Sequence, residues 1–69
     1  MIPFKLRGEY IELGQLLKAA SFVATGGEAK IAITSGLVKV DGQVDKRKGA
    51  KIRAGQVVEF NGETIKIEA

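Results

Sequence analysis

The sequence contains no cysteine, histidine or tryptophan among its 69 residues. Without cysteine there can be no disulfide framework, and without cysteine and histidine the usual zinc sites and Cys/His nucleophile arrangements are excluded. No apolar run approaches the roughly 18 residues of a membrane-spanning helix, and Lys5 and Arg7 interrupt the first segment before a secretory signal could form. We therefore expect a cytoplasmic protein without metal, cofactor, small-molecule substrate or membrane contact.

Groups suited to catalysis are also scarce. The carboxylate pairs, Asp41 with Asp45 and Glu59 with Glu63, flank predicted turns, where solvated turn chemistry explains them. The glycine pair at 26–27 lies outside any P-loop pattern, because the G-x-x-x-x-G-K-[ST] spacing is missing. We expect no enzymatic activity.

Length and composition favour one small globular domain over residues 1–69. The apolar fraction of 45% supplies a core, and the charged fraction of 28% is too low for a disordered tail. A chain this short buries only a modest core, so packing and hydrogen bonds must supply its stability.

The first half of the chain predicts two helices. Leu13, Leu16, Leu17 and Ala20 repeat at helical spacing, which predicts a helix over about 12–20. A second helix begins at Thr25, which forms a capping box with Glu28, and ends at Gly36. Its expected apolar positions are Ala29, Ala32, Ile33 and Leu37.

Beyond residue 36 the apolar period changes to two. Strands at 38–40 and 43–44 are joined by Asp41-Gly42, and strands at 57–60 and 64–67 by Asn61-Gly62, both strong hairpin signals. A short opening strand is expected at 2–4. Helices followed by strands predict an α+β fold with two helices packed on a small, mostly antiparallel sheet of four to five strands.

Positive charge is concentrated in the stretch KRKGAKIR at 46–53, which carries five cations and no acidic residue. The whole chain has a net charge of +3, but the remaining six basic and eight acidic residues outside this stretch sum to −2. A local cluster of this kind is typical of a surface that binds a polyanion, although a solvated loop has the same composition.

The pattern T-x-x-x-A-K-x-x-I-x-x-G-x-V-x-V-D-G over 25–42 resembles the signature of the RNA-binding domain named after the fourth small-subunit ribosomal protein. The resemblance to this S-four-like domain extends back to residue 12 and forward to the turn at 54–57. In length and content the chain is similar to small stand-alone bacterial members. Many members have Arg after the cap and Arg-Leu-Asp at the start of helix one, where this chain has Gly26 and Glu12-Leu13-Gly14.

The resemblance implies an αL motif, formed by two helices and the following β-turn, which docks on structured RNA such as rRNA or tRNA. Contact with a ribosomal protein is compatible with it. Carried onto this chain, the family's basic loop is Lys46, Arg47, Lys48, Lys51 and Arg53, and its cationic helix position is Lys30. Lys18 and Lys39 are weaker matches.

Phosphate contacts would supply most of the affinity for RNA. If four or five of these cations touch phosphate, log affinity should fall against log salt with a slope of about −3 to −4. Gly26 and Gly27 leave the second helix start bare, so phosphate could reach its free N–H groups. Phe22 and Phe60 fall at expected core positions, which leaves few rings for base stacking and favours recognition of shape and backbone.

Two other partner classes stay open. A basic face also steers binding to an acidic protein, so an adaptor role, for example in ribosome assembly, is an alternative. DNA binding ranks third, because neither predicted helix presents a basic face for the major groove.

Overall fold

The computed structural model describes all 69 residues, in two helices and seven strands. Helix α1 spans Leu13–Ala19 and α2 spans Gly26–Thr34. The strands are β1 (Ile2–Lys5), β2 (Ile11–Glu12), β3 (Val38–Val40), β4 (Gln43–Val44), β5 (Lys51–Ile52), β6 (Val57–Phe60) and β7 (Glu63–Glu68). Neither helix has the length and apolar character that crossing a bilayer requires.

Five strands form one sheet in the order β1-β7-β6-β3-β4, while β2 and β5 pair separately. All pairings are antiparallel except that β1 lies parallel to β7. Both predicted hairpins form, and their turns at Asp41-Gly42 and Asn61-Gly62 have positive φ at both residues, as a type I′ turn requires. The predicted α+β fold with a mostly antiparallel sheet is confirmed.

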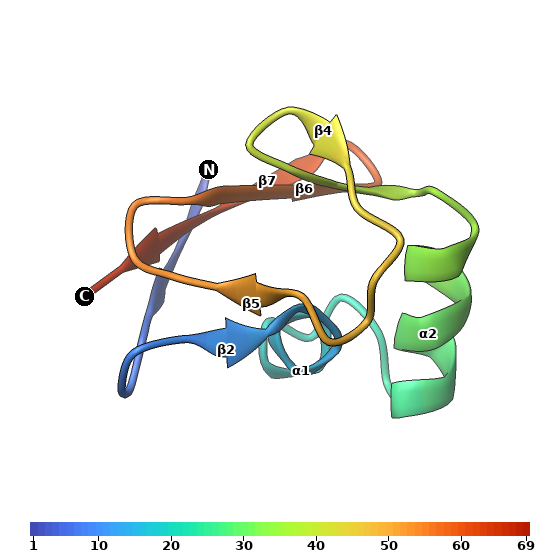
Figure 1. Ribbon diagram of the computed structural model, residues 1–69, viewed down its shortest axis with the longest axis horizontal. Coiled ribbons are helices and arrows are strands. Elements are labelled where there is room, and N and C mark those ends of the chain that lie inside the picture. Colours follow the sequence, from blue (N-terminus) through green and yellow to red (C-terminus); the bar gives the residue numbers. More distant parts are fainter.

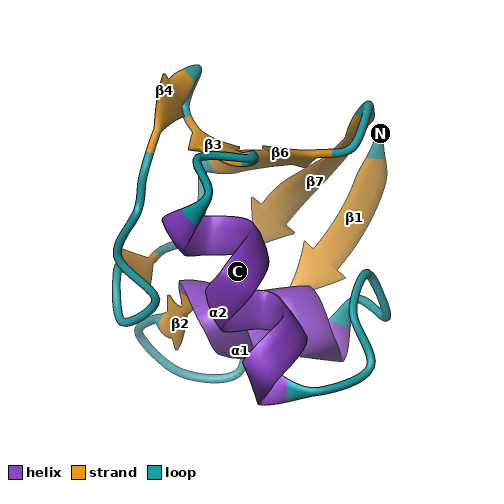
Figure 2. Cartoon of the chain, turned by 90° about the vertical axis from the view of Figure 1, so that its right-hand side faces the viewer, coloured by secondary structure: helices purple, strands orange, loops and turns teal.

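The hydrophobic core lies between two layers (Figures 1 and 2). The five-stranded sheet forms one layer, and both helices with the β2–β5 pair form the other. The sheet contributes Val38, Val58, Ile65 and Ile67, the helices contribute Leu13, Leu16, Leu17, Ala29, Ala32 and Ile33, and β5 contributes Ile52. The opposite face of the sheet has no helix over it and carries exposed side chains such as Lys39 and Glu59.

Helix α2 begins with the predicted capping box. The Thr25 hydroxyl accepts from the N–H of Glu28 at 3.1 Å, and the Glu28 carboxylate accepts from the N–H of Thr25 at 3.3 Å. Gly36 has a φ of +80° and ends the helical segment as expected. The prediction that Leu37 continues the apolar face of the second helix was wrong. Leu37 is 59% exposed, because the left-handed conformation of Gly36 ends the helical segment before this position.

Candidate nucleic-acid interface

The basic segment at 46–53 passes α2 on its way from β4 to β5 (Figures 1 and 2). Its main chain is held by the start of α1, where the N–H of Leu13 donates to the carbonyl of Ala50 at 2.9 Å and the N–H of Gly14 donates to that of Lys48 at 3.0 Å. Such N–H groups have no partner within their own helix, so the segment supplies their acceptors. The segment is therefore fixed in place while its cationic side chains are exposed.

Lys48 crosses from the start of α1 to the start of α2. A Cβ atom added at Gly14 would lie only 2.7 Å from Lys48 Cγ, and one added at Gly26 would lie 3.6 Å from Lys48 Nζ. The aliphatic stem thus occupies the space that a side chain at position 14 would need. The ammonium group of Lys48 lies beside the first turn of α2.

Lys46 lies at the other end of α2, where a Cβ added at Gly36 would be 3.5 Å from Lys46 Cε. Lys30 follows Gly26 by one helical turn and so shares its flank of α2. All three lysines are exposed. The structure therefore gathers Lys30, Lys46 and Lys48 along α2, which we call the α2 basic surface.

The start of α2 has two unused hydrogen-bond donors. The Glu28 carboxylate accepts from the N–H groups of Ala24 and Thr25, so it leaves the N–H groups of Gly26 and Gly27 without an acceptor. A helix start also carries the positive end of the backbone dipole. Two bare donors with the Lys48 ammonium beside them make this end of the surface attractive to an anion.

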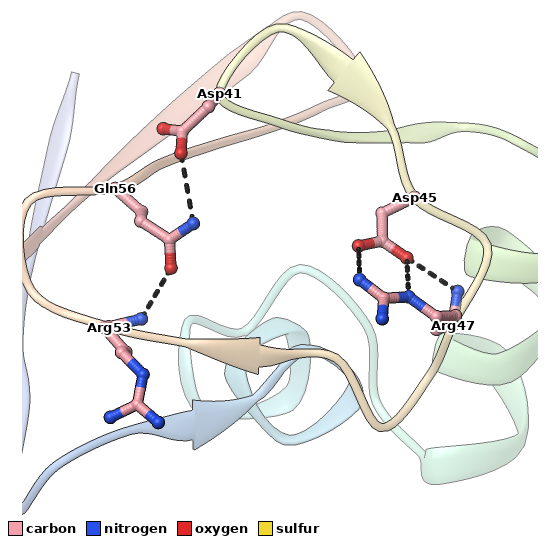
Figure 3. Close-up of polar contacts among 5 residues, drawn as sticks. All are labelled: Asp41, Asp45, Arg47, Arg53 and Gln56. Carbon is pink, nitrogen blue, oxygen red and sulfur yellow. Dashed lines mark hydrogen bonds and ion pairs between the residues drawn. The ribbon is translucent and has the colours of Figure 1, made fainter.

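Arg47 differs from its neighbours because it is paired with Asp45 (Figure 3). Its Nη2 lies 2.9 Å from Asp45 Oδ2, its Nε donates to Oδ1 at 3.1 Å, and its main-chain N–H donates to Oδ1 at 2.9 Å. The side-chain hydrogen bond from Arg47 lowers the pKa of Asp45 below its ordinary value. The Arg47 side chain is still 79% exposed, but part of its charge is neutralised.

Lys51 and Arg53 form a second cationic group, which lies at strand β5 and is separate from the α2 basic surface. Ile52 between them is buried, so the two cations share the outward side of the strand. Lys51 Nζ lies 5.1 Å and Arg53 Cζ 5.6 Å from the centre of the Tyr10 ring. Sequence reasoning treated this stretch as loop and missed both β5 and Tyr10.

A short polar network joins this second group to the β3–β4 turn (Figure 3). The Asp41 carboxylate accepts from the N–H of Val57 and from Gln56 Nε2, each at 3.0 Å. The side-chain oxygen of Gln56, Oε1, accepts from the main-chain N–H of Arg53 at 2.7 Å. The hydrogen bond from Val57, followed by that from Gln56, lowers the pKa of Asp41. Asp41 therefore connects the β3–β4 turn to the loop between β5 and β6.

The two weaker sequence matches lie in different places. Lys18 is exposed in the last turn of α1, one turn after Gly14, and borders a depression with Phe22 and Glu28. Lys39 lies opposite Glu59 on the outer face of the sheet, the side away from the helices. The structure therefore does not bring Lys39 to the α2 basic surface.

Fold and cationic surface together define a small α+β domain of the αL type. A family model of the S4 domain matches residues 4–68, and the chain belongs to this family. The resemblance stated from the sequence is thereby confirmed.

Among similar proteins is YbcJ of Escherichia coli strain K12, which is 48% identical over 70 residues and covers 100% of both chains. The solution structure of YbcJ, described as revealing an αL motif involved in RNA binding, superposes with a TM-score of 0.77 at 46% identity, over 100% of this chain and 89% of that one. The probable ribosome maturation protein RlbA of Bacillus subtilis strain 168 is 40% identical over 60 residues, covering 87% of this chain and 84% of RlbA. These relatives are small bacterial proteins, as the sequence predicted.

Proposed function

We propose that this protein is a non-catalytic RNA-binding protein that contacts the phosphates of structured RNA through the basic segment and α2. The observation that carries the proposal is the fixed course of the segment. Hydrogen bonds to the start of α1 hold its main chain, while Lys46 and Lys48 stand exposed beside α2. A pre-formed surface loses little conformational freedom on binding, so more of the electrostatic attraction is retained as affinity.

The expected strength of the salt dependence follows from the number of free cations. Within the basic segment and α2, five of the cations implied by the resemblance are exposed and outside any ion pair: Lys30, Lys46, Lys48, Lys51 and Arg53. If each neutralises one phosphate, the slope of log affinity against log salt is about −3.5, using the coefficient for single strands. Charge and shape dominate such binding, which favours folded RNA over a particular base sequence.

We propose ribosomal or transfer RNA as the target, and the ribosome maturation protein among the relatives supports the ribosomal choice. RlbA is named for ribosome maturation, and the YbcJ structure is described by its αL motif involved in RNA binding. We propose a role in rRNA or tRNA metabolism in the cytoplasm, where contact with a ribosomal protein would be compatible with RNA binding.

Charge reversal tests the proposal. Lys48→Glu should weaken binding to folded RNA, whereas Lys66→Glu, an equal charge change on the outer face of the sheet, should have a much smaller effect. The triple variant Arg47→Glu, Lys48→Glu and Lys51→Glu should lose binding and keep the circular dichroism spectrum of the fold. Equal effects of Lys48→Glu and Lys66→Glu would show that only net charge matters and would contradict the proposed surface.

An adaptor that binds an acidic protein is the second candidate, because the same exposed cations would steer such a partner. The purified protein separates the two candidates. Nuclease-sensitive material absorbing at 260 nm supports RNA as the partner, and co-elution of an acidic polypeptide that survives nuclease supports the adaptor.

A further inference from the structure

Tyr10 is the one tyrosine of the chain, and it is 41% exposed. The other aromatic residues, Phe4, Phe22 and Phe60, are partly buried and pack against the core. An exposed ring on a cationic surface is the kind of platform on which proteins stack unpaired bases. The sequence-based expectation that the chain has few stacking platforms therefore overlooked this one.

The ring is held by its two cationic neighbours. Lys51 Nζ and Arg53 Cζ lie 5.1 and 5.6 Å from its centre, within the range of cation–π attraction. Glu12 faces Lys51 across the β2–β5 pair, yet the structure contains a single ion pair, Arg47 with Asp45. No carboxylate therefore neutralises the charges of Lys51 and Arg53 beside the Tyr10 ring.

A groove of about 520 Å³ opens beside the ring, between β1 and α1. Phe4, Leu6 and Ile11 give it apolar walls, Tyr10 adds an aromatic ring, and Lys5 and Arg7 add two cations. Its volume falls within the roughly 300–1,000 Å³ typical of sites for small organic groups. Gln15 also lines it and offers an amide donor and acceptor suited to the edge of a base.

We propose, on the basis of the proposed RNA-binding function, that this groove receives one unpaired nucleotide of the bound RNA. The base stacks on Tyr10 at the apolar wall, and the phosphates on either side of it contact Lys51, Arg53 and Arg7. The preferred RNA is then a paired stem interrupted by an unpaired nucleotide, as at a bulge or junction.

Continuity of the surface favours a nucleotide over an acidic peptide. Lys48 and Lys51 are separated by only two residues of the basic segment, so we expect one RNA backbone to reach both the α2 basic surface and the cations at β5. A nucleotide combines a flat apolar ring with a charge on each side, which matches an aromatic wall with cations at its edge. An acidic side chain would satisfy the cations and leave the ring and the apolar wall unused.

Two RNA hairpins that differ by one unpaired nucleotide in the stem provide the test. The wild-type protein should bind the bulged hairpin more tightly than the fully paired one. Tyr10→Ala should weaken binding of the bulged hairpin by about 5- to 150-fold and change binding of the paired hairpin by less than about 2-fold. Tyr10→Phe keeps the ring and should retain most of the preference, whereas Tyr10→Leu should lose it.

Tyrosine fluorescence gives a second readout, because Tyr10 is the sole tyrosine and there is no tryptophan. After correction for absorption by the RNA, the bulged hairpin should quench the wild-type signal and the paired hairpin should not. This measurement needs no variant, so it decides the question even if Tyr10→Ala is unstable.

The outcomes separate the two proposals. If the wild-type protein binds both hairpins equally and neither quenches Tyr10, the nucleotide site is refuted while RNA binding stands. If it binds neither hairpin nor any other folded RNA but binds an acidic peptide through Tyr10 and Arg53, both proposals are refuted.

Discussion

Gly14→Ala should weaken RNA binding through a residue 34 positions further along the chain. A Cβ atom at position 14 would lie 2.7 Å from Lys48 Cγ, closer than carbon atoms approach one another, and 3.0 Å from Lys48 Cε, which is a tight contact. The main chain of Lys48 is held by its hydrogen bond from the N–H of Gly14, so its side chain must move instead. The ammonium group would then leave its position beside Gly26.

The size of the effect can be worked out from this geometry. Alanine in place of a helical glycine favours α1 by about 1 kcal/mol, and moving Lys48 into a less favourable rotamer costs about 0.5–1.5 kcal/mol. These terms nearly cancel, so the melting temperature should stay within about 4–8 °C of that of the wild type. Loss of one phosphate contact should reduce the slope of log affinity against log salt by about 0.7–0.9 from its value near −3.5.

The assay is a titration of one folded RNA at several salt concentrations, together with a thermal melt of the free protein. Gly49→Ala is the matched control, because it adds the same methyl group to the basic segment where nothing lies within 4 Å of it. The control should keep the wild-type slope. An unchanged slope for Gly14→Ala, or an equal loss for Gly49→Ala, would refute the role assigned to the Lys48 side chain.

Three further predictions concern the glycines and the carboxylates of this surface. The double variant Gly26→Ala, Gly27→Ala should weaken RNA binding, because the added methyl groups cover two free N–H groups. It should not lower the melting temperature, since the added Cβ atoms meet nothing closer than 3.6 Å. Unchanged affinity would exclude a phosphate at the start of α2. Asp41→Asn should lower the melting temperature at pH 7, and the difference from wild type should shrink as the pH falls below about 4. The reason is that the pKa of Asp41 is lower in the folded state than in the unfolded state. The carboxylate therefore contributes its full stability above the unfolded pKa of about 3.9, and this contribution is lost as the carboxylate is protonated. A difference that stays constant down to pH 2 would contradict this. Asp45→Asn should release Arg47, tighten RNA binding and steepen the salt slope by about 0.7–0.9, with little loss of stability because the ion pair is at the surface. Titrations that show no change would mean that Arg47 does not reach the RNA.

Much of the fold was predictable because its signals are local. The capping box needs only Thr25 and Glu28, and each hairpin needs only its two turn residues and the alternation on either side. Leu37 was wrongly predicted as a helical apolar position because that prediction used spacing alone. Apolar spacing continued to it, whereas the positive φ at Gly36 had already ended the helix.

The candidate site was predictable in its composition and only partly in its arrangement. The cluster of cations and the position of Lys30 followed from sequence pattern and family resemblance. The sequence did not predict that β5 divides this cluster into two groups, because a strand of two residues has too few positions to show an alternating pattern. Its pairing with β2, which brings Tyr10 under Lys51 and Arg53, depends on a partner about 40 residues earlier in the chain.

The sequence by itself determined the two helices, the two hairpins and the concentration of positive charge in one stretch, since each depends on residues a few positions apart. Tertiary structure decided that β1 lies parallel to β7, that Lys48 occupies the space left by Gly14, and that Tyr10 joins the cations of β5. These contacts join residues that are distant along the chain. They form because one shared core fixes where each element lies, and no local pattern records that position.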